Sequence, residues 1–245
     1  MPTFKITVAY DGADFCGWQR QPSGLSIQGL LEDALRDLDQ RNVTVIGAGR
    51  TDAGVHALAQ VAAFTLEREI APDALVRAMN VRLPDTVRVG AAEAVPPTFH
   101  PQFDSRSKQY RYRIWNDDVM SPFERRYAWH VLGELDVDAM QRAAKLLEGE
   151  HDFAAFQATD SDTKTTVRTI FSSEICKLKS EISYDVVGSG FLRHMVRNIT
   201  GSLVDVGRRR FPVEWLSDVL ASRDRTKAGR AAPPHGLFLV RVNYQ

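Results

Sequence analysis

A glycine-rich segment in the first quarter of the chain, Gly47 to His56, carries one carboxylate and one guanidinium. It lies between two short apolar runs, residues 43–46 and 58–66, each of which predicts a buried strand. Glycine permits positive φ angles and close approach of another backbone, and Arg50 can bind a phosphate or keep the Asp52 carboxylate ionised. The segment therefore predicts an active-site loop with Asp52 as nucleophile or base. A tight turn with a local ion pair is the alternative that composition alone favours.

Two further side chains suit chemistry on a nucleotide. Tyr110 shares one face of an alternating Tyr-Arg-Tyr-Arg strand with Tyr112, and a ring facing a cleft could stack on a base, a contact worth roughly 1 to 3 kcal/mol. Arg197 lies at the edge of the apolar stripe of a predicted helix, from where it can reach a cleft. A core tyrosine and a solvent-directed arginine at a helix edge are the alternatives.

Histidines invite a metal or acid–base interpretation. His56 and His100, with Asp104, match no spacing of known metal ligands, and a histidine in a glycine-rich loop more often bonds backbone or phosphate. The loop lacks the Gly-Lys-Ser/Thr ending of a nucleotide-cradling loop, and Cys16 and Cys176 have no partners at metal-site spacing. We therefore expect no metal site and no disulfide framework.

The formal net charge of the 245-residue chain is zero, so any contact with nucleic acid needs a local cluster of cations. Several arginines are interleaved with aromatic residues and are candidates for such a cluster: Arg20, Arg50, Arg106, Arg111, Arg113, Arg125, Arg126, Arg193, Arg197 and Arg208 to Arg210. We find no signal peptide and no apolar run near the length of a membrane-spanning helix, which predicts a protein of the reducing cytoplasm.

Apolar periodicity predicts the elements that position these residues. The expected strands are 4–10, 43–46, 58–66, 110–115, 182–187 and 237–242, and the expected helices are 27–38 with Ser26 as N-cap, a segment from Pro72 to before Pro84, 136–147, 192–206 and 213–221. We infer an α+β fold of two related lobes, 1–104 and 105–245, each an antiparallel sheet with helices on one side. An active-site cleft is expected between the lobes.

Motifs along almost the whole chain resemble one enzyme family. They are the loop with the following residues 57–64, the segments 10–12 and 15–21, the segments 99–103 and 108–114, and the segment 191–198. In order and spacing they resemble the tRNA pseudouridine synthase A (TruA) family. The resemblance implies the pseudouridine synthase fold, a homodimer, and an isomerase that flips a uridine out of the anticodon arm of tRNA, at positions 38–40, and converts it to pseudouridine without a cofactor.

The resemblance also assigns roles. It implies catalysis by Asp52 and substrate binding by Tyr110, Arg50, Arg197, His56 and Leu237. Tyr110 is selected over Tyr112 because the family's stacking tyrosine is the first of this pair. Whether Asp52 attacks C1′, attacks C6, or acts by way of a glycal stays open.

Two other classes of function stay open as well. A nucleoside hydrolase would use Asp52, although glycosidases ordinarily use two carboxyl groups and no second acid lies in a comparable motif. A noncatalytic RNA-binding module would account for the arginines but has no need of a carboxylate beside RNA, where it repels phosphate. The polar segment 158–166, with its acidic residues, departs from the family pattern and suggests an altered choice of tRNA.

Overall fold

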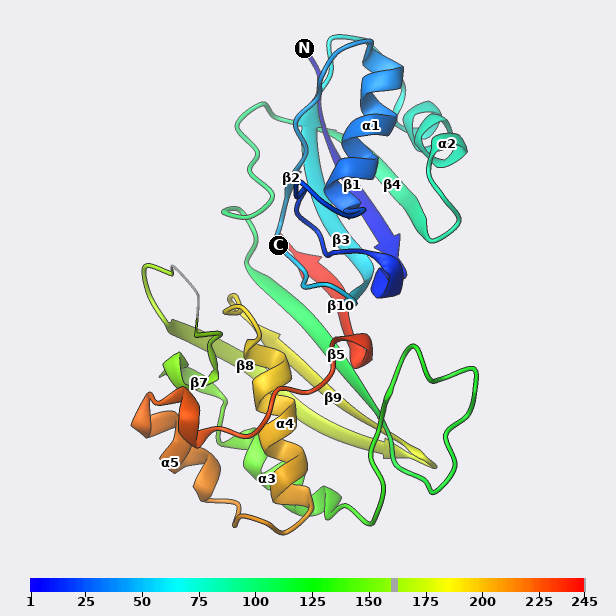
Figure 1. Cartoon of the computed structure of the whole chain (residues 1–245). Coiled ribbons are helices and arrows are strands. Elements are labelled where there is room, and N and C mark those ends of the chain that lie inside the picture. Colours follow the sequence, from blue (N-terminus) through cyan, green and yellow to red (C-terminus); the bar gives the residue numbers. More distant parts are fainter. Residues whose placement is uncertain (160–162, 245) are drawn as a thin grey trace. The chain divides into compact units, whose positions relative to one another are not determined.

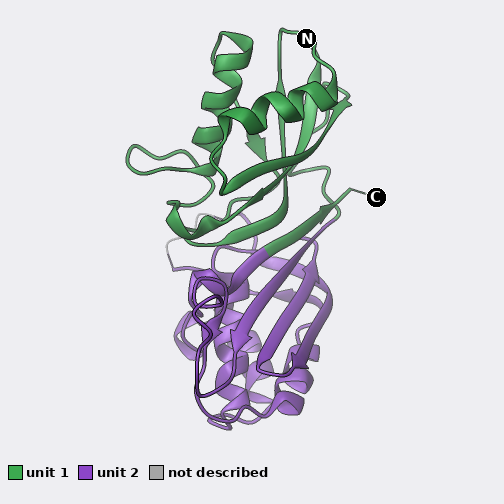
Figure 2. Cartoon of the chain, turned by 90° about the vertical axis from the view of Figure 1, so that its right-hand side faces the viewer, with its two compact units in different colours: residues 1–106, 239–245 green, residues 107–238 purple. Residues whose placement is uncertain are grey.

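A computed structural model describes residues 1–159 and 163–244, so the middle of the polar segment 158–166 lies outside the described residues. The chain divides into two compact units, shown in Figure 2: unit 1 contains residues 1–106 and the chain from Leu239 onward, and unit 2 contains residues 107–238. The predicted lobes, 1–104 and 105–245, differ from these units chiefly at the C-terminus, where the chain returns to unit 1.

Unit 1 contains β-strands and two α-helices (Figure 1). Its strands are β1 (Thr3–Tyr10), β2 (Ile46–Gly47), β3 (His56–Thr65), β4 (Val87–Val95) and most of β10 (Leu237–Asn243). Its α-helices are α1 (Ile27–Asp39) and α2 (Pro72–Arg82), and η1 (Gly12–Asp14) is a short 3-10 helix. The order β4-β1-β3-β10 puts β1 in the interior, antiparallel to both β3 and β4, and β2 adds to β3. Every second side chain of β1 from Phe4 to Tyr10 is buried, as the alternating sequence predicts.

Local sequence signals determine where the two α-helices of unit 1 begin. The Ser26 hydroxyl accepts a hydrogen bond from the Gly29 N–H at 3.2 Å and caps α1, as predicted. Ile27, Leu31 and Leu35 recur on one face of α1 and are fully buried. Proline in the first turn starts α2, where its missing N–H costs no hydrogen bond.

Unit 2 contains five strands, mostly paired antiparallel, and three α-helices. Its strands are β5 (Ser107–Trp115), β6 (Trp129–His130), β7 (Gly149–Asp152), β8 (Val167–Leu178) and β9 (Glu181–Gly188), and its helices are α3 (Val137–Lys145), η2 (Ala154–Phe156), α4 (Met195–Gly207), α5 (Trp215–Ser222), η3 (Arg225–Lys227) and η4 (Pro234–Gly236). The order is β5-β9-β8-β7, and β6 runs parallel to the end of β5. Tyr110 lies opposite Val186 in this register, and Tyr112 lies opposite Tyr184.

Helix α4 is the central helix of unit 2, because each of its residues except Arg197 is buried. Gly201 lets α4 pack directly on a later segment of the chain, since a Cβ there would overlap the carbonyl oxygen of Arg230. The helix begins at Met195 and not at residue 192 as predicted, because His194 adopts a left-handed conformation with φ 63°.

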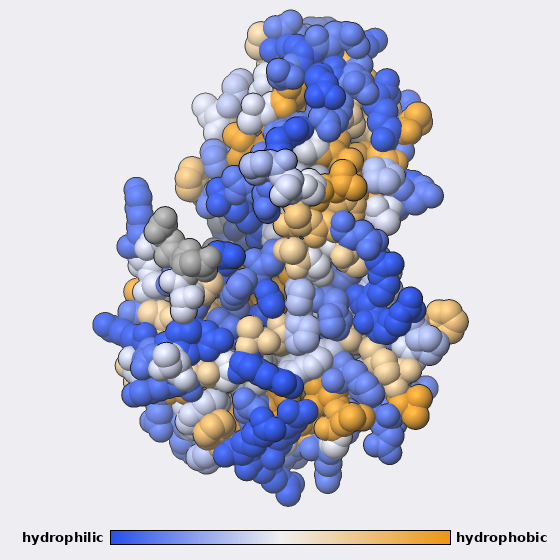
Figure 3. Space-filling view, in the orientation of Figure 1, coloured by the Kyte–Doolittle hydropathy of each residue, from blue (hydrophilic) through white to orange (hydrophobic). Residues whose placement is uncertain are grey.

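The predicted α+β class is confirmed, while some predicted elements are wrong. The expected strand 43–46 is reduced to the two-residue β2, although Val43 and Val45 are buried. Strands β4, β7 and β8 were not predicted. Among the described residues no helix is long and apolar enough to cross a membrane, and Figure 3 shows hydrophilic side chains over most of the visible face.

Candidate active site

The Gly47–His56 loop connects β2 to β3 in unit 1 and contains a tight turn at Asp52. The Val55 N–H donates to the Asp52 carbonyl oxygen at 3.1 Å, and Gly54 adopts φ +77°, which glycine reaches without strain. Asp52 is half-buried and Arg50 is exposed. Arg50 forms no ion pair with Asp52 within the described chain, so the local ion pair that composition suggested is absent there.

The N-terminal motifs of the sequence form the support of this loop. The Tyr10 hydroxyl lies 2.8 Å from the Thr51 hydroxyl, and the Trp18 N–H donates to the Thr51 carbonyl oxygen at 3.0 Å. A Cβ at Gly47 would lie 2.6 Å from the Trp18 ring, and one at Gly17, where φ is +109°, would lie 2.7 Å from the Thr51 carbonyl oxygen. Burial raises the pKa of Tyr10, which keeps the phenol neutral beneath the loop. The glycines thus allow backbone and indole to pack at contact distance and fix the path of the loop.

His56, the last residue of the loop, contacts Asp11 and Gly12. The Gly12 N–H donates to His56 Nδ1 at 3.0 Å, and Asp11 Oδ1 lies 3.1 Å from the same nitrogen. Gly12 has no room for a side chain, because a Cβ would overlap the Val55 carbonyl oxygen. His56 is 1 % exposed, so these contacts favour a role in holding the loop against η1.

In unit 2 the two tyrosines of β5 differ in their surroundings. Tyr110 packs edge-on against Phe191 with ring centroids 5.0 Å apart. Tyr112 is fully buried, its hydroxyl donates to the Pro233 carbonyl oxygen at 2.7 Å, and Gly236 packs against its ring. Every polar group of Tyr112 is therefore used inside unit 2, as expected of a core residue.

Residues 232–237 connect Arg197 and Leu237 in unit 2: Arg197 contacts the first of them, Ala232, and Leu237 is the last. The Arg197 Nε donates to the Ala232 carbonyl oxygen at 2.8 Å, and the Ala232 N–H donates to the Arg197 carbonyl oxygen at 3.0 Å. These two bonds hold the guanidinium stem against the chain that leads into β10. Leu237 begins β10 and is 6 % exposed.

The predicted site residues therefore fall into two sets. Unit 1 holds Arg50, Asp52 and His56, and unit 2 holds Tyr110, Arg197 and Leu237.

Sequence reasoning missed Lys108, which shares the Tyr110 face of β5 because residues two apart in a strand point the same way. Burial, together with the Arg168 guanidinium, lowers the pKa of Lys108 to about 8. Burial also lowers the pKa of Arg168, whose Nη1 donates to the carbonyl oxygens of Thr165 and Val167. The signal was present in the sequence as a lysine two residues before the predicted stacking tyrosine.

Many of the candidate RNA-binding arginines are paired with carboxylates. The pairs are Arg20 with Glu32 and Asp33, Arg111 with Asp185, Arg113 with Glu181 and Glu124, Arg209 with Asp136, and Arg210 with Asp205. These arginines carry less free positive charge than the sequence suggested. In the part of the chain that the structure describes, no group of three or more His, Cys, Asp or Glu residues could hold a metal ion.

Residues 6–104 and 143–245 match the family model described as tRNA pseudouridine synthase. The chain belongs to the tRNA pseudouridine synthase family, and the predicted family and enzyme class, an isomerase, are confirmed.

Relatives that align with this chain over its full length are named tRNA pseudouridine synthase A. The chain is 48 % identical over 244 residues to tRNA pseudouridine synthase A of Pelobacter propionicus, with both chains covered completely. It is 46 % identical over 246 residues to the protein of that name from Myxococcus xanthus, covering 100 % of this chain and 93 % of the relative. A crystal structure of a Cbf5-Nop10-Gar1 complex aligns with TM-score 0.41 and 13 % identity over 96 % of this chain and 48 % of that one, so the present chain spans about half its length.

Proposed function

We propose that the protein converts uridine to pseudouridine in the anticodon arm of tRNA, at positions 38–40, with Asp52 as the catalytic nucleophile. The family match, which covers both the Asp52 loop and the helix of Arg197, is the observation that carries the proposal. The rigid support of the loop by Trp18 and Thr51 suits a carboxylate that must meet one atom of a flipped nucleotide.

The reaction is an isomerisation. The bond between C1′ and N1 breaks, the uracil turns, C5 bonds to C1′, and the C5 hydrogen leaves as a proton while N1 gains one. No oxidant, reductant or transferred group is needed. Asp52 supplies the negative charge that attacks ribose or base, and the nucleotide must leave the helical stack to reach it.

The remaining residues have proposed roles around that step. Tyr110 stacks on the uracil, with Phe191 packed edge-on to hold its ring. Arg50, which is exposed, binds a phosphate beside the flipped nucleotide. Arg197 supports the charge of Asp52, and Leu237 provides an apolar wall. His56 was predicted to bind substrate, and its contacts favour a contribution through the position of the loop.

Tritium release from a tRNA transcript labelled at uracil C5 tests the proposal, because C5 must lose its hydrogen. We expect release by the native protein, none by Asp52→Asn, and tRNA affinity largely retained in that variant. Asp37→Asn, an exposed change on α1, is the matched control and should release tritium at the native rate.

Each alternative has its own signature in the same assay. Release by Asp52→Asn at the native rate would contradict the role of Asp52. Free uracil among the products would identify a nucleoside hydrolase. Tight tRNA binding by the native protein, with no release from any tRNA, would identify a binding module.

The homodimer and the cytoplasmic location that the resemblance implies are also part of the proposal. Two copies would place the cations of both chains on one tRNA, and this would compensate for the lack of net positive charge on a single chain. Light scattering should give twice the chain mass of 27.4 kDa. A monomer with undiminished activity would contradict the dimer.

A further inference from the structure

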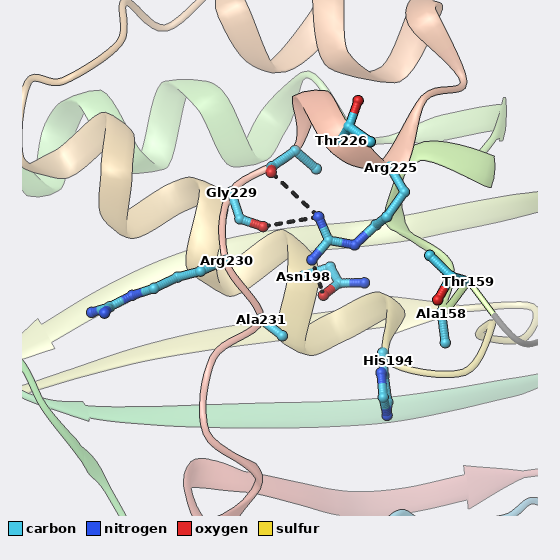
Figure 4. Close-up of a pocket in the computed structure, with 10 residues that line it drawn as sticks. Ala158, Thr159, His194, Asn198, Arg225, Thr226, Gly229, Arg230 and Ala231 are labelled. Atoms are coloured by element: carbon cyan, nitrogen blue, oxygen red, sulfur yellow. Dashed lines mark hydrogen bonds between the residues drawn. The ribbon is translucent and has the colours of Figure 1, made fainter.

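Unit 2 contains a cavity of about 410 Å³ between the start of α4 and residues 225–231 (Figure 4). Polar groups line it, among them the Arg225 guanidinium, the Asn198 amide and the Thr159 hydroxyl, and none of the lining residues that the structure describes is acidic. Its volume lies within the roughly 300 to 1,000 Å³ typical of small-molecule sites.

Arg225 is held in this cavity by neutral acceptors only. Its Nη1 donates to the carbonyl oxygens of Ala228 and Gly229 at 3.3 and 3.1 Å, and its Nη2 donates to Asn198 Oδ1 at 3.0 Å, as Figure 4 shows. A guanidinium has five N–H groups, so these contacts leave the Nε–H and the second Nη2–H. Each of these two N–H groups can donate to an oxygen of an anion.

The positive charge of Arg225 has no counter-ion in the part of the chain that the structure describes. The nearby carboxylates are occupied: Asp205 pairs with Arg210 at 3.0 Å, and Asp224 accepts from the Thr226 N–H and hydroxyl at 2.9 and 2.7 Å. Burial lowers the pKa of Arg225, which is the effect of removing a cation from water without an anionic partner. The other lining guanidinium, Arg230, extends away in Figure 4 and lies over the Trp129 ring at 5.0 Å.

We propose that this cavity binds a phosphate group, with the remaining N–H groups of Arg225 as its principal donors, and that the phosphate belongs to the RNA backbone of the bound tRNA. The choice of RNA as the source rests on the proposed function. A carboxylate ligand is the less suitable anion, because nucleic-acid phosphates are what a tRNA enzyme meets at high local concentration.

The cavity is connected to Arg197 through one short segment, residues 228–232. Arg225 bonds the carbonyl oxygens at one end of the segment, the Gly229 N–H donates to Ser202 Oγ at 2.9 Å, and Arg197 bonds Ala232 at the other end. A phosphate on Arg225 therefore fastens the segment that positions the Arg197 side chain.

Two variants remove the anion site in different ways. Arg225→Gln removes the charge and the guanidinium donors. Thr159→Glu keeps Arg225 and adds a carboxylate to the lining of the cavity, where we expect it to pair with the guanidinium. Thr159 is exposed, so folding should tolerate the change. Lys227→Gln is the control, because it removes one charge from η3 without touching the cavity.

tRNA affinity measured across a range of salt concentrations gives the first readout. Loss of one phosphate contact should weaken binding roughly tenfold and lower the salt slope by about one, in both cavity variants and much less in Lys227→Gln. If melting shows that Arg225→Gln is unfolded, the folded Thr159→Glu variant decides.

Free phosphate compounds give the second readout. Inorganic phosphate should stabilise the native protein weakly against heat, and this shift should vanish in the cavity variants. If the variants lose only this shift and keep native tRNA affinity, a free phosphate compound is the ligand and the RNA source is wrong. If both readouts match the native protein, the phosphate site is overturned. Tritium release by the native protein tests the proposed function separately.

Discussion

Two tyrosines on one face of β5 give a matched pair with opposite expected consequences. Tyr110 is proposed to stack on the uracil, and Tyr112 is buried in the core of unit 2. Tyr110→Ala should therefore impair the reaction and, because Tyr110 is only 8 % exposed, also lower stability, whereas Tyr112→Phe should lower stability and leave the chemistry intact.

The magnitudes follow from the contacts. Tyr110→Ala removes a stacking platform worth roughly 1 to 3 kcal/mol, or about 5- to 150-fold in kcat/KM. Tyr110→Phe keeps the ring and should retain most of the stacking, so its residual defect measures the hydroxyl. Tyr112→Phe deprives the Pro233 carbonyl oxygen of its donor at 2.7 Å. An unsatisfied buried carbonyl costs about 1 to 3 kcal/mol, which lowers Tm by roughly 2 to 12 °C in a chain of this length.

Calorimetry and single-turnover tritium release, measured on the same preparations, separate the two effects. Native kcat/KM in Tyr110→Ala would refute the stacking role. Loss of activity in Tyr112→Phe without a fall in Tm would show that the assignment of the two tyrosines is reversed. A loss of activity in Tyr110→Ala that is fully accounted for by its unfolded fraction would mean that the ring serves packing alone.

Two further predictions concern stability. Because burial lowers the pKa of Lys108 from 10.5 to about 8, the unfolded chain binds more protons between these pH values, and the free energy of unfolding rises with pH there by up to about 3 kcal/mol. Urea titrations should show that Lys108→Met removes this rise and that Lys179→Met, an exposed change, keeps it; identical profiles would contradict the burial. Gly201→Ala should cost about 1 to 3 kcal/mol or more in melting experiments, because the new methyl group overlaps the Arg230 carbonyl oxygen. Gly90→Ala, whose Cβ would have its nearest neighbour at 4.0 Å, should be close to neutral, and equal losses in the two would refute the packing.

Apolar periodicity and capping residues were sufficient to predict those helices and strands that one local sequence signal determines. The alternation of β1, the Ser26 cap of α1 and the Pro72 start of α2 are each decided within a few residues, and the structure has them as predicted. The prediction of a strand at 43–46 was wrong because a short apolar run indicates burial and does not indicate strand pairing. Val43 and Val45 are buried, yet the chain meets β3 only at Ile46 and Gly47.

Long-range features had no local signal. Nothing in residues 237–243 shows that most of this strand joins unit 1, beside β3, because the choice of neighbour is made by distant strands. The start of α4 depends on one left-handed residue, His194, a conformation that sequence periodicity does not report. The ion pairs of the arginines also could not be predicted from the sequence, because Arg111 contacts Asp185 only when β5 and β9 are aligned in register.

The zero net charge of the chain conceals an uneven distribution of cations. Arg111 and Arg113, on the face of β5 opposite Tyr110, are neutralised by carboxylates from the neighbouring strand. Lys108 and Arg225, by contrast, are partly buried and form no ion pair within the described chain. An unpaired buried cation costs folding free energy, and binding of an anion recovers it, so such residues bind phosphate more tightly than exposed lysines do. A neutral chain can therefore bind tRNA through a few desolvated cations, and its affinity should fall less steeply with salt than that of a protein with a broad basic surface.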